Sequence, residues 1–271
     1  MLNVVGGLIG SLLLNIHWLC VTAIVAGCLT YWFFHGYDER LGWTIVGLVG
    51  VLISNKLCSL FCSRGALLRP DKLDRYIYNL DGLLHCQPSF AMGRLIHDRL
   101  YLIVLCKSIY FVAPFTLLAV FYGFLWFRSK AEAIAILPVA VLNIVIGVTI
   151  YMLVPVSGPA YAFPSYPQLP SEPVVSEVVP INAPPNGVPS LHFSTALLIL
   201  WYARKLPYGT LLGSVFLMLT TGAILGLGEH YVFDLVVAVP YTVMVYKLGT
   251  SVARLVHTSV NGVECMQATT R

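Results

Sequence analysis

The sequence predicts an all-α polytopic membrane protein, a helical bundle with six to seven transmembrane helices. Of its 271 residues, 58% are hydrophobic and only 10% are charged, and the mean hydropathy is +0.82. Soluble domains carry about 25% charged residues. Long apolar runs recur along the chain, and a membrane span needs about 20 such residues. The net charge of +4 is too small to indicate a nucleic-acid partner.

Seven apolar runs justify the predicted helices. In chain order they cover Val4–Phe34, Leu41–Phe61, Leu100–Phe127, Ala133–Val156, Ser190–Ala203, Gly209–Leu227 and Tyr231–Leu248. The fifth run is short for a span unless the long cationic side chains at its end reach back to the interface.

These runs divide the chain into four parts that form one membrane domain. Residues 1–62 hold the N-terminal transmembrane helices, and residues 100–250 hold a transmembrane core. Between them, residues 63–99 mix apolar and charged side chains at helical spacing, so we expect an amphipathic helix lying in the interface. Residues 251–271 are expected to form a cytoplasmic tail.

Lysines and arginines in short loops predict the orientation, because they favour the cytoplasmic side. They lie after the third, fifth and seventh runs, at Arg128, Lys130, Arg204, Lys205, Lys247 and Arg254. The loop over residues 157–189 has none and is expected to face the periplasm, the lumen or the exterior.

The segment over residues 62–99 departs from that rule. It falls on the non-cytoplasmic face, yet it carries Arg64, Arg69, Lys72, Arg75, Arg94 and Arg99. Either one of the first two runs does not span the membrane, or these cations hold anionic headgroups or phosphate.

The same topology brings two histidines to one face. His192 begins the fifth run, and His230 precedes the seventh, after the chain has crossed and returned. The stretch PVSGPAY (155–161) ends the fourth run on that face as well. We therefore expect these three stretches to converge at one membrane depth.

His230 and Asp234 are spaced i and i+4, so on a helix they can touch. A carboxylate on one imidazole nitrogen fixes the tautomer and leaves the other nitrogen free as a nucleophile or base. The alternative is a structural pair that braces the bundle.

Ser190 and His192 follow Pro189 at a predicted helix start. The N-terminus of a helix offers free N–H groups and a positive dipole end, which suit a phosphate. His192 could then donate a proton to a leaving oxygen. Ser190 could equally be a purely structural N-cap.

The stretches PSLH (189–192) and HYVFD (230–234), two runs apart, resemble the second and third motifs of the type-2 phosphatidic acid phosphatase (PAP2) superfamily. Within it, PSLH, Tyr231 and PVSGPAY are most similar to the inositol phosphorylceramide synthase-like branch. The resemblance extends over about residues 81–240.

The resemblance implies a role for each motif residue. His230 would form a phospho-histidine, Asp234 would orient it, and His192 would protonate the leaving lipid oxygen, with no metal. In the same way we expect Ser190, Gly158, Pro159, Tyr161 and Tyr231 to contact substrate or phosphate.

The sequence departs from the superfamily at two cation positions. Cys62 stands where the first motif would place a lysine, and Ile224 stands where the third motif would place an arginine. A transferred phosphoryl group needs its charge neutralised. We expect Lys107, about two turns into the third run, and Arg99 to supply the cations.

The predicted function is a membrane lipid phosphotransferase that uses a phospholipid donor and a lipid acceptor such as ceramide or diacylglycerol. A lipid phosphate phosphatase would share the intermediate and use water as acceptor. A proton-coupled transporter with His230–Asp234 as a relay, or a non-catalytic lipid-binding protein, are the alternatives of another class.

Overall fold

The computed structural model describes the backbone of residues 2–269 and the side chains of residues 18–255. Its long helices are α1 (Leu2–His35), α2 (Glu39–Leu68), α5 (Leu100–Phe127), α7 (Ile136–Leu153), α9 (Leu191–Ala203), α10 (Gly209–Gly226) and α11 (Val232–Thr269). A short helix, α6 (Lys130–Ile134), leads directly into α7. Within the described residues, six segments are long and apolar enough to cross a membrane, and α9 is a shorter apolar helix. The all-α polytopic bundle is confirmed.

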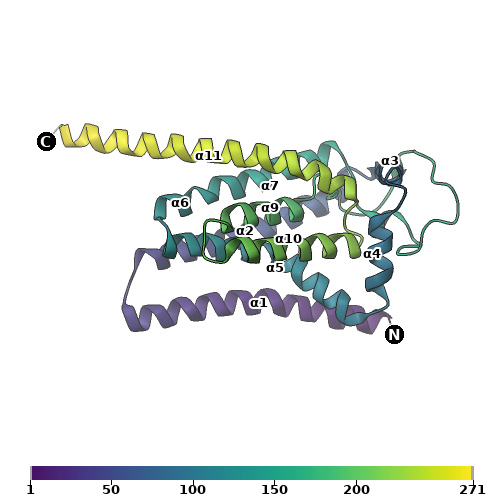
Figure 1. Cartoon of the computed structure of the whole chain (residues 1–271), viewed down its shortest axis with the longest axis horizontal. Coiled ribbons are helices and arrows are strands. Elements are labelled where there is room, and N and C mark those ends of the chain that lie inside the picture. Colours follow the sequence, from purple (N-terminus) through teal and green to yellow (C-terminus); the bar gives the residue numbers. More distant parts are fainter. Residues whose placement is uncertain (1, 270–271) are drawn as a thin grey trace.

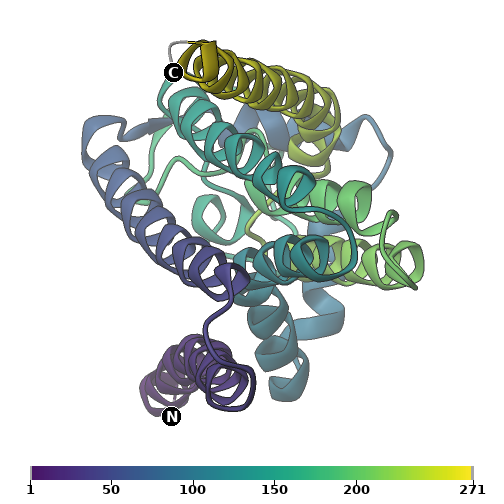
Figure 2. The same ribbon diagram turned by 90° about the vertical axis from the view of Figure 1, so that its left-hand side faces the viewer.

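The short helix α9 lies at the centre of the bundle. It packs against α5, α7, α10 and α11, while α1 contacts only α2 and α5 to any extent. Figures 1 and 2 show α1 at the edge, set apart from the other long helices. A 13-residue α9 extends only about 20 Å at 1.5 Å per residue. Its first residues lie beside the start of α11, where the amide of Ser190 donates to the carbonyl of Asp234.

Tight apolar contacts fill the interior of the bundle. Phe121 of α5, Val139 of α7, Ile199 of α9 and Val245 of α11 belong to one buried cluster. Because lipid tails are as apolar as these side chains, close packing and interhelical hydrogen bonds hold membrane helices together.

A buried polar seam links α7, α9 and α11. Ser194 donates to Oδ1 of Asn143 over 2.7 Å, and Thr242 donates to Ser194 over 2.8 Å. All three side chains are buried, so their polar groups satisfy one another inside the bundle. The seam fixes how α9 sits between its neighbours.

The segment after residue 62 differs from the single amphipathic helix that the sequence predicts. Helix α2 continues to Leu68, and two short helices follow, α3 (Asp74–Gly82) and α4 (Pro88–His97). Pro88 is the first residue of α4, and a proline disfavours helical geometry in the residue before it, which separates the two. Helix α4 packs on α10 and α5.

Two small strands and a short helix complete the end of the molecule where α3 lies. Strand β1 (Asp71–Lys72) pairs antiparallel with β2 (Val179–Pro180), and α8 (Pro159–Ala162) follows α7 after a turn. The pairing ties residues 157–189 to α3.

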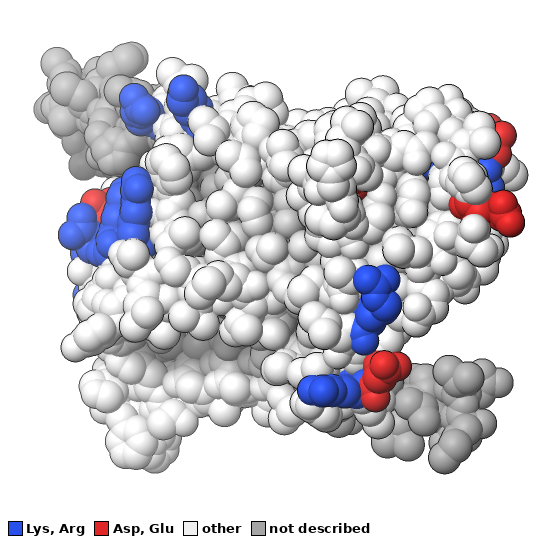
Figure 3. Space-filling view, turned by 45° about the vertical axis from the view of Figure 1, so that its right-hand side comes forward, with Lys and Arg blue, Asp and Glu red and all other residues white. Residues whose placement is uncertain are grey.

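The two ends of the bundle carry most of the charge. The α5–α6 and α9–α10 connections lie at one end, called here the basic end, and α3 with the 157–189 loop lies at the other (Figure 1). The two connections carry Arg128, Lys130, Arg204 and Lys205. Between the ends, Figure 3 shows a broad band with almost no charged side chain. This arrangement agrees with the predicted course of the chain; which end faces the cytoplasm stays a prediction.

Candidate active site

His230 and Asp234 form a buried pair at the start of α11. Nδ1 of His230 lies 3.2 Å from Oδ2 of Asp234, and their side chains are 1% and 0% exposed. The i, i+4 contact predicted from the sequence is therefore present. With Nδ1 held by the carboxylate, Nε2 is the ring nitrogen that can act on a substrate.

Three carboxylate contacts satisfy the first amides of α11. Asp234 accepts from the amide of Tyr231 over 2.9 Å. Asp81 of α3 accepts from Val232 and Phe233 over 2.8 and 2.9 Å. The first N–H groups of a helix have no partner within it, and negative charge is favourable at this end. Helix α3 thus caps α11 and holds the His230 loop.

His192 projects from the first turn of α9 beside His230. The centres of the two imidazole rings are 6.4 Å apart. Ser190 caps α9 by accepting from the amide of Phe193, and its own amide donates to the carbonyl of Asp234 over 3.3 Å. The two predicted motifs therefore meet directly.

Tyr110 of α5 lies flat against His192. Their ring centres are 3.6 Å apart and the planes are inclined by 25°. Stacking of this kind limits rotation of the imidazole. Tyr110 therefore fixes the direction in which His192 presents its nitrogens.

The stretch PVSGPAY also reaches the site, as the sequence predicts. The amide of Ala160 donates to the carbonyl of Gly228 over 2.9 Å. Gly158 has φ of +115°, and a Cβ there would lie 2.4 Å from the carbonyl oxygen of Glu229. Only glycine allows the two stretches to approach so closely.

Asp74 of α3 organises this stretch from behind. It accepts from the amides of Ser157 and Gly158 and from the hydroxyl of Tyr231, the last over 3.0 Å. Burial raises the pKa of Asp74 to about 6, and these hydrogen bonds oppose the rise. The structure thus places Gly158 and the fully buried Tyr231 as supports of the loop, with their donors directed at Asp74.

Glu229 stands immediately before His230, with Tyr161 beside it. The hydroxyl of Tyr161 donates to the Glu229 carboxylate over 3.1 Å, and Pro159 is buried at the start of α8. Burial raises the pKa of Glu229, and the nearby charges of His230 and Lys107 lower it.

The two expected phosphate cations have different positions. Lys107 lies three residues before Tyr110 on α5, one turn from the ring that covers His192. Arg99 precedes α5, is exposed, and donates to Tyr101. It lies eight residues from Lys107, about 12 Å along a helix. Lys107 is thus one helical turn from Tyr110, whereas Arg99 is at the surface; that either holds a phosphate stays a prediction.

The sequence model of the PAP2 superfamily matches residues 75–248, well over half of the chain. The protein belongs to the PAP2 superfamily. Members of this superfamily are typically lipid phosphatases or phosphotransferases, which makes the chain an enzyme of this kind. Searches of curated proteins and of solved structures find no significant match.

Both PSLH and HYVFD lie within the residues that the PAP2 model matches. At the position of the missing third-motif arginine, Ile224 is fully buried and packs with Leu235 and Met92. An apolar contact stands here where the third motif would place a cation. Among the described residues, Lys107 is the lysine whose charge lowers the pKa of Glu229.

Several site residues of this PAP2 protein were not predicted. Asp74, Asp81 and Ser89 support the motif loops from α3 and α4; Ser89 donates to the carbonyl of His230 over 2.7 Å. The i, i+7 spacing of Asp74 and Asp81, which puts both carboxylates on one helix face, is the sequence feature that could have identified them. Tyr110 had no comparable signal.

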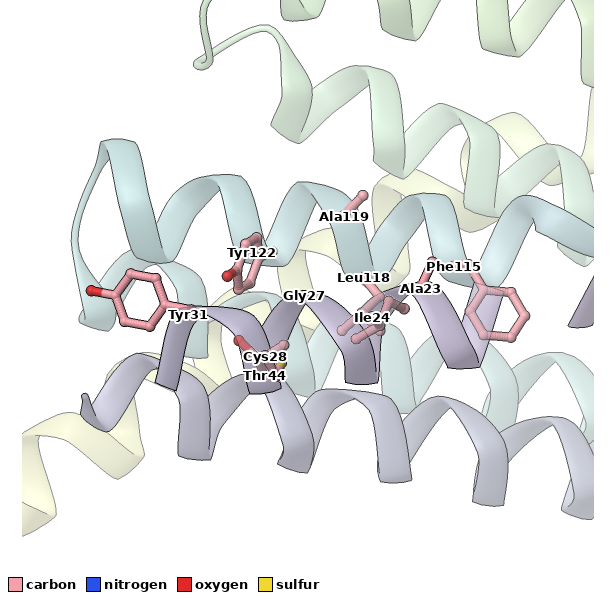
Figure 4. A pocket seen from close by; sticks show the side chains of 10 residues that line it. All are labelled: Ala23, Ile24, Gly27, Cys28, Tyr31, Thr44, Phe115, Leu118, Ala119 and Tyr122. Atoms are coloured by element: carbon pink, nitrogen blue, oxygen red, sulfur yellow. The ribbon is translucent and has the colours of Figure 1, made fainter. Parts of the chain in front are cut away.

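Two cavities of similar size lie between the helices. One, of about 350 Å³, lies between α2, α5, α7 and α9, is open on one side, and is lined in part by His192. The other, of about 340 Å³, lies between α1 and α5 and is lined by Tyr31, Cys28 and Tyr122 among others (Figure 4). Of these two, the first reaches a predicted active-site residue.

Proposed function

We propose that this PAP2 protein is a lipid phosphotransferase of the inositol phosphorylceramide synthase-like kind. It would move a phosphoryl group or a phospho-headgroup from a phospholipid to a lipid alcohol such as ceramide or diacylglycerol. The observation that carries the proposal is the buried His230–Asp234 pair beside His192, with ring centres 6.4 Å apart. A nucleophile held by a carboxylate, with an acid–base group next to it, is the arrangement that covalent transfer requires.

In the first step, Nε2 of His230 attacks the phosphorus of the donor. A nitrogen–phosphorus bond forms and the bond from phosphorus to the leaving oxygen breaks. The electron pair stays on that oxygen, which takes a proton from protonated His192. Asp234 holds the His230 ring in the required tautomer and stabilises the positive charge that develops on it.

In the second step, the hydroxyl of the acceptor approaches from the side of His192. Neutral His192 takes the hydroxyl proton, the oxygen attacks phosphorus, and the nitrogen–phosphorus bond breaks with its electron pair returning to His230. The proton lost in the first step is regained in the second. The chain needs no other reactant for this cycle.

Lys107 is proposed to hold the phosphoryl oxygens, together with the positive end of α9 that Ser190 caps. A cation in a membrane helix is costly without a partner. The charge of Lys107 lowers the pKa of Glu229, and a phosphate bound near both residues would give Lys107 a partner of opposite charge.

The position of the basic loops supports an active site on the non-cytoplasmic face, such as the periplasmic side of a bacterial inner membrane or the lumen of the endoplasmic reticulum or Golgi. The site lies at the start of α11, at the end opposite the basic end (Figure 1). A proton relay for transport would instead need ionisable side chains along the whole path, whereas these gather at one end.

The test is to incubate the purified protein with a phospholipid labelled in its phosphate, with and without ceramide or diacylglycerol. A new labelled lipid that depends on the acceptor is expected. Release of free phosphate instead would assign a phosphatase, and no reaction with any acceptor would refute the proposal.

His230→Ala should abolish turnover while the protein remains folded, because removal of a covalent nucleophile costs many orders of magnitude. His85→Ala, at an exposed loop position on the same end, is the matched control and should retain full activity. More than a few per cent of activity in His230→Ala would exclude His230 as the nucleophile.

A further inference from the structure

The cavity beside His192 runs along α2 and α7 and opens between them, where Val46 and Val141 are 54% and 55% exposed. On α2 its lining extends from Val46 to Cys58, and on α7 from Leu137 to Ile144. Twelve helical steps correspond to about 18 Å, more than half of the hydrocarbon thickness of about 30 Å. The cavity thus leads from His192 toward the basic end, between helices that are apolar along most of its length.

Two polar side chains on α2 face this cavity without a protein partner. Ser54 and Asn55 line it, and neither side chain has a hydrogen bond among the described residues. Asn143 and Thr195 also line it, but they bond to each other over 3.2 Å. An unpaired amide inside a membrane helix is unfavourable. The contents of the cavity should therefore be apolar over most of their length and carry a hydrogen-bonding group near Asn55.

We propose that this cavity binds the hydrocarbon chain of the lipid alcohol that exchanges with the phospho-enzyme, a proposal that rests on the phosphotransferase function above. The hydroxyl of the alcohol would lie at His192. A carbonyl a few atoms away, in an amide or ester linkage, would accept from Asn55. The chain would extend along α2 toward Val46.

The position of His192 argues for this occupant. His192 lines the cavity, and its ring lies beside His230. An alcohol in the cavity would reach the base before the nucleophile, as an acceptor must. Water could not fill the apolar length of such a cavity favourably, which favours transfer to a lipid over hydrolysis.

The second cavity offers a matched control. Gly50 lines the His192 cavity and Gly27 lines the cavity between α1 and α5, and a Cβ on either would meet nothing within 4 Å. Gly50→Leu and Gly27→Leu therefore each fill one cavity of similar volume. Leucine also favours the helix over glycine, so both variants should fold.

The direct test is photo-crosslinking in the His230→Ala protein, which reports binding without turnover. The probes are a ceramide and a diacylglycerol, each with a diazirine at the chain end. Adducts are expected on α2 near Val46 or on α7 near Leu137, at least tenfold fewer in Gly50→Leu and unchanged in Gly27→Leu. The better-labelled probe identifies the acceptor. Equal labelling in both variants, or adducts only around the α1–α5 cavity, would overturn the proposal.

Kinetics separate this proposal from the function on which it rests. With wild-type His230, Gly50→Leu should raise the KM for ceramide or diacylglycerol at least tenfold, and Gly27→Leu should not. Unchanged KM values in a protein that makes labelled lipid would refute the cavity and leave the function standing. No labelled lipid from the wild type would refute the function itself.

Asn55→Leu tests the polar contact. It should raise the KM about fivefold to tenfold for acceptors that have a carbonyl, the scale for one lost hydrogen bond. A long-chain alcohol without a carbonyl should be accepted as well as by the wild type. An equal effect on both kinds of acceptor, or on neither, would rule out the carbonyl contact.

Discussion

Helix α3 holds the His230 loop through Asp81, so Asp81→Ala should impair catalysis from a distance. The substitution removes the acceptor for the amides of Val232 and Phe233. Asp81 is 2% exposed. A hydrogen bond to a charged group contributes roughly 1.5–3 kcal/mol, so two such bonds set a loss of about 3 kcal/mol even at the lower value.

This loss of stabilising free energy weakens the contact between α3 and α11. It does not unfold the bundle, because the long helices remain inserted in the membrane. At about 1.4 kcal/mol per factor of ten, 3 kcal/mol raises the population of a displaced loop by about 150-fold. We expect turnover to fall roughly ten- to a hundredfold, because His230 must stay within about 1 Å of its productive position.

The assay combines turnover with hydrogen exchange at the amides of Val232 and Phe233. Both amides should exchange faster in Asp81→Ala. Asp81→Asn keeps one carbonyl acceptor, so its turnover and its amide exchange rates should lie between those of the wild type and those of Asp81→Ala. Asp98→Ala, at an exposed aspartate at the end of α4, is the control. Activity within twofold of wild type and unchanged exchange in Asp81→Ala would refute the capping role of α3.

Three further predictions address the phosphate cation, the pH dependence and the orientation. Lys107→Met should lower turnover about a hundredfold, Lys107→Arg should recover part of it, and Arg99→Gln should have a weaker effect; an active Lys107→Met would exclude this cation. The pKa of Asp74 is raised to about 6, so its stabilising contribution is complete below about pH 4 and is lost as the pH rises through 6. The melting temperature in detergent should therefore fall between about pH 4 and 6. Asp74→Asn should flatten this dependence, and parallel pH curves of melting temperature for the wild type and Asp74→Asn would contradict the prediction. In a background without native cysteines, an impermeant reagent should label cysteine at Ser176 and not at Ser129 in intact cells, and the reverse would invert the topology.

The sequence was sufficient for the features that depend on local pattern. Apolar runs predict the spans, and the i, i+4 spacing predicts the contact between His230 and Asp234. The alternation of basic loops predicts that His192 and His230 share one end. These arguments need only the geometry of a helix and the cost of charge in lipid, and both act on the order of residues along the chain.

Contacts between segments far apart in the chain could not be predicted in the same way. Tyr231 bonds to Asp74 across 157 residues, and neither periodicity nor charge identifies such a pair. Pro88 carried the signal that separates α3 from α4, but the mixed apolar and charged pattern favoured one continuous helix. Tyr110 belongs to a uniformly apolar run, in which no residue stands out as the partner of His192.

The most direct test of the phosphotransferase mechanism is the covalent intermediate on His230. The purified protein is mixed with a phospholipid labelled in its phosphate, quenched without acceptor, and the labelled peptide is identified. The mechanism predicts an acid-labile phosphoramidate on His230 that disappears into a new lipid when acceptor is added, and no label in His230→Ala. Lipid transfer at the full rate without labelled protein, or with the label on another residue, would contradict it.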